Sequence, residues 1–173
     1  SCGYSVADLE KGGNGYIPVT LQYRPYTASE AREHSIAGGD FREKQPDRGY
    51  KNKSNLPYNA GDLDLILDAR EKMGDKPVIV VLCMHNPAVV REFEPSSDAI
   101  LVDFGVQRDA VLDVLFGDYE PRGRLPVILP ADMETVERHC EDVFEDIEPY
   151  TDSEGHCYKN GFGMNYSRVL DEK

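Results

Sequence analysis

The stretch LFGDYEPRGRLPVILP (residues 115–130) predicts the end of a buried helix, a rigid turn and then a short core strand. Gly117 stands where a helix needs a residue in the left-handed conformation in order to stop. Pro121 and Gly123 favour a turn, because proline fixes φ and glycine tolerates positive φ. The apolar run at residues 125–129 is typical of a strand inside the core.

Apolar runs and amphipathic stretches alternate through the rest of the chain. Residues 78–84 (VIVVLCM) and 99–104 (AILVDF) are almost continuously apolar, which predicts strands covered on both faces. The expected strands are 16–23, 78–84, 99–104 and 125–129. The expected helices are 62–73, ended by Gly74; a short one with Asn86 as cap and Pro87 in its first turn; one lined by Val111, Leu112 and Leu115; and one lined by Met133, Val136 and Cys140, with Asp132 as cap.

Strand–helix–strand repeats of this length imply parallel pairing with right-handed crossovers. We therefore expect an α/β fold, a flavodoxin-like three-layer sandwich with a mostly parallel sheet, as a single domain over residues 1–173. Residues 150–173 are expected to form a C-terminal extension, and the acidic, turn-rich chain after Val143 is expected to wrap the domain as loops and a short hairpin.

Composition narrows the class of partner. The 173-residue chain carries a formal net charge of −13, so it repels phosphate backbones and nucleic acid is not an expected partner. A neutral ligand such as a sugar is compatible with this charge. No apolar stretch is long enough to cross a bilayer, so no membrane partner is expected. The GGNG at residues 12–15 precedes its strand, whereas a phosphate-binding loop follows one, and no cofactor is expected.

The chain opens with SCGYSVADLEKGGNG, which is not a signal peptide and is more typical of the middle of a protein. We therefore expect a truncated domain. If strands normally precede Ser1, the sheet has a bare edge, and such an edge invites pairing into a homodimer. The localisation of the parent protein stays open, with the periplasm or secretion as options.

None of the four cysteines belongs to a Cys-x-x-Cys pair, so a structural zinc site is not expected. Cys83 lies in an apolar run and is expected to be a small core residue. Cys140 and Cys157 are expected to remain unpaired. Residues 152–157 (DSEGHC) contain metal-ligand residue types, but they form a typical turn sequence, and no metal is expected there.

Residues 24–53 form a long segment with little hydrophobic periodicity. Loops of this length are uncommon in small domains, and they are usually functional or disordered. The segment begins at the carboxyl end of the first expected strand, the edge at which open α/β sheets bind ligands. Composition alone is equally compatible with a solvated linker, and the position favours a functional loop.

Four segments together resemble the C-terminal α/β-sandwich domain of glycoside hydrolase family 3, the two-domain β-glycosidases. They are residues 76–90 (KPVIVVLCMHNPAVV), 97–118 (SDAILVDFGVQRDAVLDVLFGD), 115–130 and 150–167 (YTDSEGHCYKNGFGMNYS). His85 stands where the family commonly has glycine. The turn that follows residue 104 lacks the Pro-Gly and Gly-Gly pairs common in the family, which weakens the case for a backbone contact to sugar there.

This resemblance implies a hydrolase of β-linked glucosides or related sugars, in which two carboxyl groups flank the scissile bond, about 5–5.5 Å apart in a retaining mechanism. It places the nucleophilic aspartate on a separate N-terminal (β/α)8 barrel, for which this chain is too short. The acid/base often comes from the loop after a strand like 16–23, and the count places its equivalent near Ala28, which carries no carboxyl group. The alternative acid/base candidates are Glu30, Asp40 and Glu43, with Glu33 beside them; the candidate substrate-binding residues are Arg24, Tyr26 and Arg48.

Three hypotheses follow. The chain is part of a family 3 β-glycosidase that shapes the mouth of the active site, lends the acid/base and is inactive alone; or it is a non-catalytic carbohydrate-binding or interaction module with the same fold. Ala28 and the altered turn after residue 104 favour the second. A nucleotide binder is a weaker third, because no glycine-rich loop follows a strand.

Overall fold

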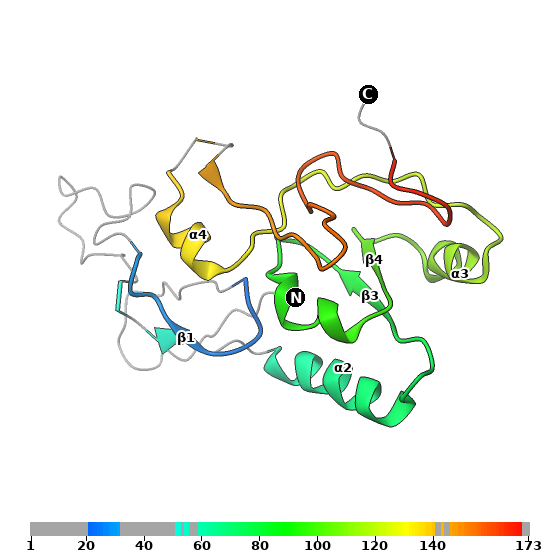
Figure 1. Ribbon diagram of the computed structural model, residues 1–173, viewed down its shortest axis with the longest axis horizontal. Helices are drawn as coiled ribbons and strands as arrows, with labels where there is room; N and C mark the ends of the chain where they lie inside the picture. The colour runs from blue at the N-terminus through cyan, green and yellow to red at the C-terminus, as the bar shows by residue number, and fades with distance from the viewer. Residues whose placement is uncertain are drawn as a thin grey trace.

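The computed structural model describes residues 21–31, 51–52, 54–55, 59–140, 143 and 146–170 (Figure 1). Asp40, Glu43, Arg48, the GGNG stretch and most of the expected strand 16–23 lie outside these residues. In chain order the elements are β1 (Tyr26–Thr27), β2 (Ser54–Asn55), α2 (Ala60–Met73), β3 (Ile79–Cys83), the 3₁₀ turns η1 (Val90–Glu92) and η2 (Glu94–Ser96), β4 (Ala99–Asp103), α3 (Arg108–Phe116) and α4 (Met133–Arg138).

The α/β architecture is confirmed by a parallel strand pair with helices around it. β3 and β4 pair in parallel, in a register that runs from Ile79 opposite Ala99 to Cys83 opposite Asp103. The helix α2 leads into β3 and lies along one side of the pair (Figure 1). The parallel sheet is small, and a second, antiparallel pair joins β1 to β2. Together the helices and the parallel sheet are consistent with the three-layer sandwich.

Three of the expected helices are confirmed. The sequence could predict them because the signals that begin or end a helix are local. α2 ends at Gly74, whose φ is +55°, and α3 ends at Gly117, whose left-handed φ is +86°. α4 begins after Asp132, whose carboxylate accepts the Thr135 N–H at 3.0 Å. None of these helices, nor any other in the described part of the chain, is long and apolar enough to span a membrane.

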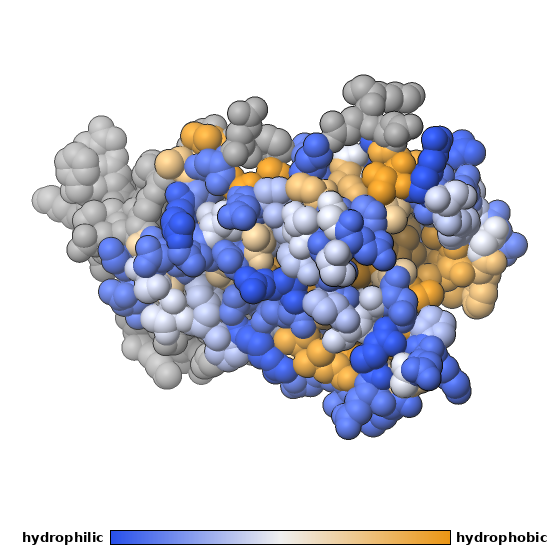
Figure 2. All heavy atoms as spheres, in the orientation of Figure 1, coloured by the Kyte–Doolittle hydropathy of each residue, from blue (hydrophilic) through white to orange (hydrophobic). Residues whose placement is uncertain are grey.

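The expectation that α3 is a buried helix is wrong for the described structure. None of its residues is buried, and the Phe116 side chain is 78 % exposed. Figure 2 shows hydrophobic surface on the side of the molecule where α3 lies. The periodicity of α3 gives an apolar stripe, but Val111, Val114 and Leu115 on it are only half-buried.

The expected strand 125–129 is also wrong: this run bends at Pro126 and Val127 and is not part of a sheet. Pro126 lies in the middle of it and has no N–H to donate to a ladder. The N–H groups at its two ends bond to the C-terminal segment instead, with Leu125 donating to the Phe162 carbonyl at 2.7 Å and Leu129 to the Tyr158 carbonyl at 3.0 Å. Residues 146–170 therefore lie along this run (Figure 1), and an isolated bridge joins Pro130 to Pro149.

Strand β3 is confirmed, but the expectation that it is covered on both faces is not. Val80 and Leu82 are buried, whereas Ile79 and Val81 are 47 % and 42 % exposed. Cys83 shares the exposed face, so its assignment to the core was wrong. Composition shows that a strand is apolar, but it does not show how many layers cover it.

Two other expected elements differ in detail. The described end of the expected strand 16–23 is a bend, because the Tyr23 N–H bonds to the Glu92 carboxylate at 2.6 Å instead of to a neighbouring strand. Asn86 does not cap a helix: the chain after Pro87 forms η1, with Val89 at its N-cap, and then η2. The apolar residues of this segment still reach the core, where Phe93 is fully buried and its ring meets that of Tyr23 edge-on at 5.6 Å.

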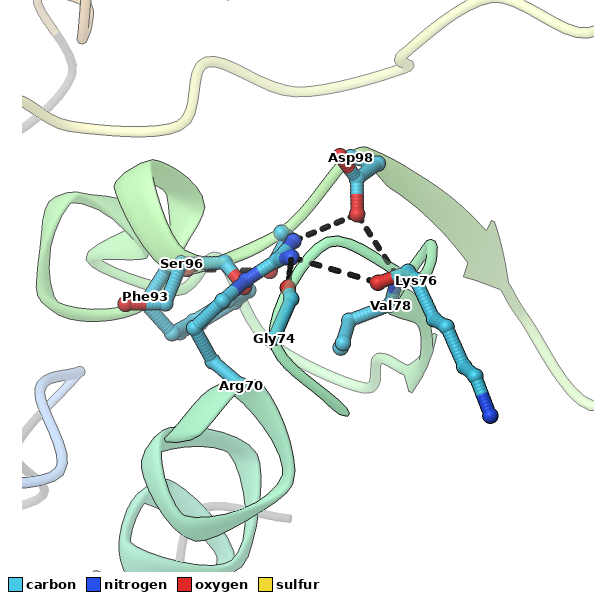
Figure 3. Close-up of polar contacts among 8 residues, drawn as sticks. Arg70, Gly74, Lys76, Val78, Phe93, Ser96 and Asp98 are labelled. Carbon is cyan, nitrogen blue, oxygen red and sulfur yellow. Dashed lines mark hydrogen bonds and ion pairs between the residues drawn. The ribbon is translucent and has the colours of Figure 1, made fainter. Parts of the chain in front are cut away.

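One arginine ties the end of α2 to both parallel strands (Figure 3). The Arg70 guanidinium donates to the carbonyls of Ser96 at 2.9 Å and of Gly74 and Lys76 at 3.3 Å, and it pairs with the Asp98 carboxylate. The end of α2, the turn that follows it and the distant segment before β4 are thereby fixed around a single planar group.

Candidate functional site

The start of the long segment is held on η1 and α2. The Glu92 carboxylate accepts the backbone N–H groups of Tyr23 at 2.6 Å and of Arg24 at 3.0 Å. The guanidinium of Arg24 pairs with Asp64 on α2 at 2.6 Å, and both side chains are exposed. An exposed pair of this kind contributes little stability, so Arg24 can exchange Asp64 for a ligand at low cost.

The next part of the segment packs on α4. Tyr26 lies in β1, with its hydroxyl buried, and Glu30 follows β1 with an exposed side chain. The Glu30 N–H donates to the carboxylate of Glu137 at 3.0 Å. Ala28 is fully buried, and its carbonyl accepts the Asn52 N–H at 2.7 Å. The structure therefore brings Tyr26 and Glu30 to one carboxyl group on α4, and it makes Ala28 a packing position.

Glu137 has an altered pKa because of this environment. Glu137 is 6 % exposed, and burial raises the pKa of its carboxyl group above the ordinary value of 4.5. The N–H groups of Glu30 and Ala31 and the Tyr26 hydroxyl act in the opposite direction, and the negative charge of Glu30 adds to the rise. Burial outweighs the hydrogen bonds.

A small hollow lies at the carboxyl end of β3, the edge at which α/β sheets bind ligands. Its volume is about 20 Å³, enough for a water molecule and far below the roughly 300–1,000 Å³ of ligand pockets. Its walls combine polar and apolar groups: Leu21, Gln22, Tyr23, Asn59, Leu82, Cys83, Met84, His85, Asn86 and Ala88. This hollow does not enclose a sugar ring.

At the carboxyl end of β4, the turn that departs from the family pattern is closed by its own side chain. The Asp103 carboxylate accepts the N–H groups of Gly105 at 2.7 Å and of Val106 at 2.8 Å. Gly105 has a φ of +95°, which favours glycine. These two N–H groups are already bonded within the chain, so a ligand would have to displace Asp103 to reach them.

The C-terminal segment carries a cluster of polar and aromatic side chains. Asp152 accepts the backbone N–H groups of Glu154 and His156 at 2.9 Å, and the His156 ring lies 3.0 Å from the same carboxylate. Burial raises the pKa of Asp152, but these partners outweigh it and the net pKa is lowered. The Tyr150 hydroxyl donates to Glu94 at 2.7 Å. The bonds to Asp152 close the 152–157 turn, and the bond to Glu94 joins this segment to η2.

Within residues 21–31, 59–140 and 146–170 there is no group of three or more histidine, cysteine or acidic side chains that could hold a metal ion. In the same ranges Cys83, Cys140 and Cys157 are free thiols.

Of the six site residues suggested by the sequence, the structure describes Arg24, Tyr26 and Glu30, and it places all three on one continuous segment. Asp40, Glu43 and Arg48 lie outside the described residues. Sequence reasoning missed Glu137 and Glu92, whose carboxylates hold this segment. The sequence gives no sign of either role, because a glutamate in a short helix is usually a solvated surface residue.

Comparison with known proteins gives a consistent answer. The model of the glycosyl hydrolase family 3 C-terminal domain matches residues 19–166. Beta-glucosidase C of Emericella nidulans is 37% identical over 161 residues, which cover 88% of this chain and 24% of that protein. The chain therefore spans about a quarter of the length of this relative.

Two further relatives carry related names. A probable beta-glucosidase C of Aspergillus flavus is 38% identical over 91 residues, or 53% of this chain and 13% of that protein. A periplasmic beta-glucosidase of Salmonella typhimurium is 27% identical over 130 residues, or 66% of this chain and 17% of that protein. No solved structure gave a significant match.

Proposed function

The chain belongs to the family of glycosyl hydrolase family 3 C-terminal domains, and from this premise we propose that it serves a longer glycosidase that acts on β-glucosides or related β-linked sugars. The family match over residues 19–166 is the observation that carries the proposal. The β-glucosidase names of the relatives support the substrate class.

In the proposed enzyme the work is divided between two domains. An N-terminal (β/α)8 barrel supplies the nucleophilic aspartate and encloses the sugar, and this chain forms part of the mouth of the active site. The relative from E. nidulans leaves room for such a barrel, because the aligned region is 24% of its length. The chain alone is therefore expected to be inactive.

The segment that begins at Arg24 is proposed to lend the proton donor. Glu30 is its described candidate, with Asp40 and Glu43 as alternatives, and Arg24, Tyr26 and Arg48 as substrate contacts. The exposure of Glu30 supports this role, since its carboxyl group can approach a sugar that another domain binds. A general acid must hold its proton near neutral pH, and closure of two domains around the sugar supplies the burial that raises a carboxyl pKa.

The experiment starts from the sequence upstream of Ser1, which should encode a barrel with a catalytic aspartate. In the full-length protein, Glu30→Gln, Asp40→Asn and Glu43→Gln are assayed on aryl β-glucosides with good and poor leaving groups. Loss confined to the poor leaving groups identifies the acid, because only these need a proton. A gene without a barrel, or hydrolysis by the isolated chain, contradicts the proposal.

A non-catalytic carbohydrate-binding or interaction module is the second candidate. It is favoured by Ala28, a buried packing residue at the position where the acid/base was expected, and by the Gly105 turn, whose N–H groups are bonded to Asp103. This candidate gains support if the full-length protein retains its activity in all three carboxyl variants.

A further inference from the structure

Glu137 is the buried charged residue of the described structure, and both its burial and its position are unfavourable. Its residue is 6 % exposed, and burial of a carboxylate is costly unless hydrogen bonds compensate for it. It lies next to the last residue of α4, where the helix dipole disfavours negative charge. Core packing alone would be served better by an apolar side chain, so the polar contacts of Glu137 need an explanation.

The contacts of Glu137 with the described residues lie on one short segment. The Glu30 N–H donates to Glu137 at 3.0 Å, and the nearby Ala31 N–H and Tyr26 hydroxyl act to lower the pKa of the Glu137 carboxyl group. Ala28 is fully buried and Ala31 is 1 % exposed, so the two flanks of Glu30 pack closely while its own side chain points to solvent. The carboxyl group of Glu137 thus fixes the backbone from which the Glu30 side chain projects.

Among the described residues, the segment also pairs with β2. β1 and β2 are two residues each, paired from Tyr26 opposite Asn55 to Thr27 opposite Ser54, and a two-stranded pair of this size is marginal on its own. The bond from the Asn52 N–H to the Ala28 carbonyl adds one link. The bond to Glu137 is the one that acts directly on the backbone of Glu30 in the described structure.

We propose that Glu137 is a positioning residue, which fixes residues 26–31 on α4 so that the carboxyl group of the acid/base segment faces the substrate in a defined orientation. This role rests on the proposed function. A general acid loses much of its effect when it is displaced by about 1 Å, and the loss is greatest for poor leaving groups, which depend on proton transfer. Glu137 itself does not touch the sugar.

The test uses the full-length protein with Glu137→Ala, Glu137→Gln and a control, Glu134→Gln. Glu134 lies in the first turn of the same helix, is exposed and pairs with Arg138, so the control removes a charge from α4 without touching the segment. The measurements are amide hydrogen exchange of Glu30 and Ala31, exchange of strand β3, and kcat and KM on aryl β-glucosides with good and poor leaving groups.

We expect Glu137→Ala to speed exchange at Glu30 about tenfold, because loss of a hydrogen bond of about 1–1.5 kcal/mol corresponds to that factor. Exchange in β3 should not change. The kcat for the poor leaving group should fall about tenfold, with KM and the good leaving group almost unaffected. Glu137→Gln keeps an acceptor for the Glu30 N–H, so its exchange rate and its kcat for the poor leaving group should lie close to the wild-type values. Glu134→Gln should behave like the wild type.

The inference is overturned if Glu137→Ala leaves exchange at Glu30 or the ratio between leaving groups unchanged. It is also overturned if both leaving groups and the exchange of β3 are affected equally, since that result indicates a purely structural residue. A wild-type protein that hydrolyses no β-glucoside defeats the proposed function, and the positioning role with it. If the wild type is active and Glu137→Ala behaves like it in every measurement, only the positioning role is refuted.

Discussion

Arg70 and Asp98 form an ion pair that joins the last turn of α2 to the residue before β4 (Figure 3). The same Asp98 carboxylate accepts the N–H of Val78, the residue before β3, at 2.6 Å. The two parallel strands therefore begin from a common carboxylate, which helps to fix their register before the first ladder bond.

Replacement of Asp98 by alanine should lower the free energy of unfolding and the melting temperature, because it removes the carboxylate that accepts the Val78 N–H and pairs with Arg70. Asp98→Asn should cost less, since its side-chain oxygen can still accept the Val78 N–H. Asp68→Asn is the matched control: Asp68 pairs with Lys72 on the exposed face of α2 at 3.7 Å, and such pairs contribute little. Urea denaturation measures all three. Equal effects of Asp98→Ala and Asp68→Asn would contradict the role assigned to Asp98.

Asp98 also predicts a loss of stability in acid. The Val78 N–H, followed by Arg70, holds the pKa of Asp98 below its ordinary value of 3.8. A group whose pKa is lower in the folded state contributes stability above the unfolded value and loses it as the pH falls through the folded value. Wild type should therefore lose its advantage over Asp98→Asn below about pH 3.8, as measured by urea denaturation at pH 7, 4 and 3. A constant difference at all three pH values would be the contrary result.

Glu137 predicts a pH dependence of the opposite sign. Its pKa is raised above 4.5, chiefly by burial, so the folded protein binds the proton more tightly than the unfolded chain. The stability that depends on this group is present below pH 4.5 and decreases as the pH rises through the folded pKa. Glu137→Gln cannot titrate and should lack this slope, whereas exposed Glu134→Gln should keep it. Denaturation curves between pH 4 and 7 measure the slope, and an identical slope in Glu137→Gln would refute the assignment.

The parts of the fold that the sequence predicted correctly have local signals. Gly74 and Gly117 end their helices, and Asp132 caps the next one, because a glycine with positive φ or a capping carboxylate acts within one turn. The errors concern long-range packing. Pro126 and the C-terminal segment prevent a strand at 125–129, and Cys83 is exposed because its neighbours along the chain do not determine the layers around β3.

The candidate site follows the same division. The sequence identified a segment with carboxyl and aromatic side chains at the edge of the fold, and the structure places Tyr26 and Glu30 on it. It could not identify Glu137, since the contact to Glu30 joins residues 107 positions apart. It could also not distinguish Glu30 from Asp40 and Glu43, because the choice depends on which carboxyl group faces the substrate.

Gly163 predicts a sharp steric effect in the C-terminal segment. A Cβ atom at Gly163 would overlap the carbonyl oxygen of Gly123 and lie 3.3 Å from the Cα of Arg124. Both are backbone atoms, so Gly163→Ala should destabilise the protein by about 1–3 kcal/mol, as overpacking typically does. Gly123→Ala is the control on the other side of the same contact, with nothing within 4 Å of its Cβ, and should change stability by less than about 0.5 kcal/mol. Thermal melts compare the two, and equal losses would show that the contact does not constrain the fold.

Tyr150 and Glu94 connect the C-terminal segment to η2, and they predict an alkaline transition. Burial, followed by the hydrogen bond to Glu94, raises the pKa of Tyr150 from 10.0 to about 12. Between these values the unfolded chain releases the phenolic proton and the folded protein keeps it, so stability falls as the pH rises through this window. Tyr150→Phe should lack this part of the fall, and it should lower stability by about 1 kcal/mol at neutral pH through loss of the hydrogen bond. Tyr119→Phe, at a side chain that is 58 % exposed, is the control and should retain the wild-type dependence. Absorbance titration at alkaline pH, with denaturation at each step, measures both effects. If Tyr150 ionises together with the exposed tyrosines, the C-terminal segment does not stay bound to Glu94.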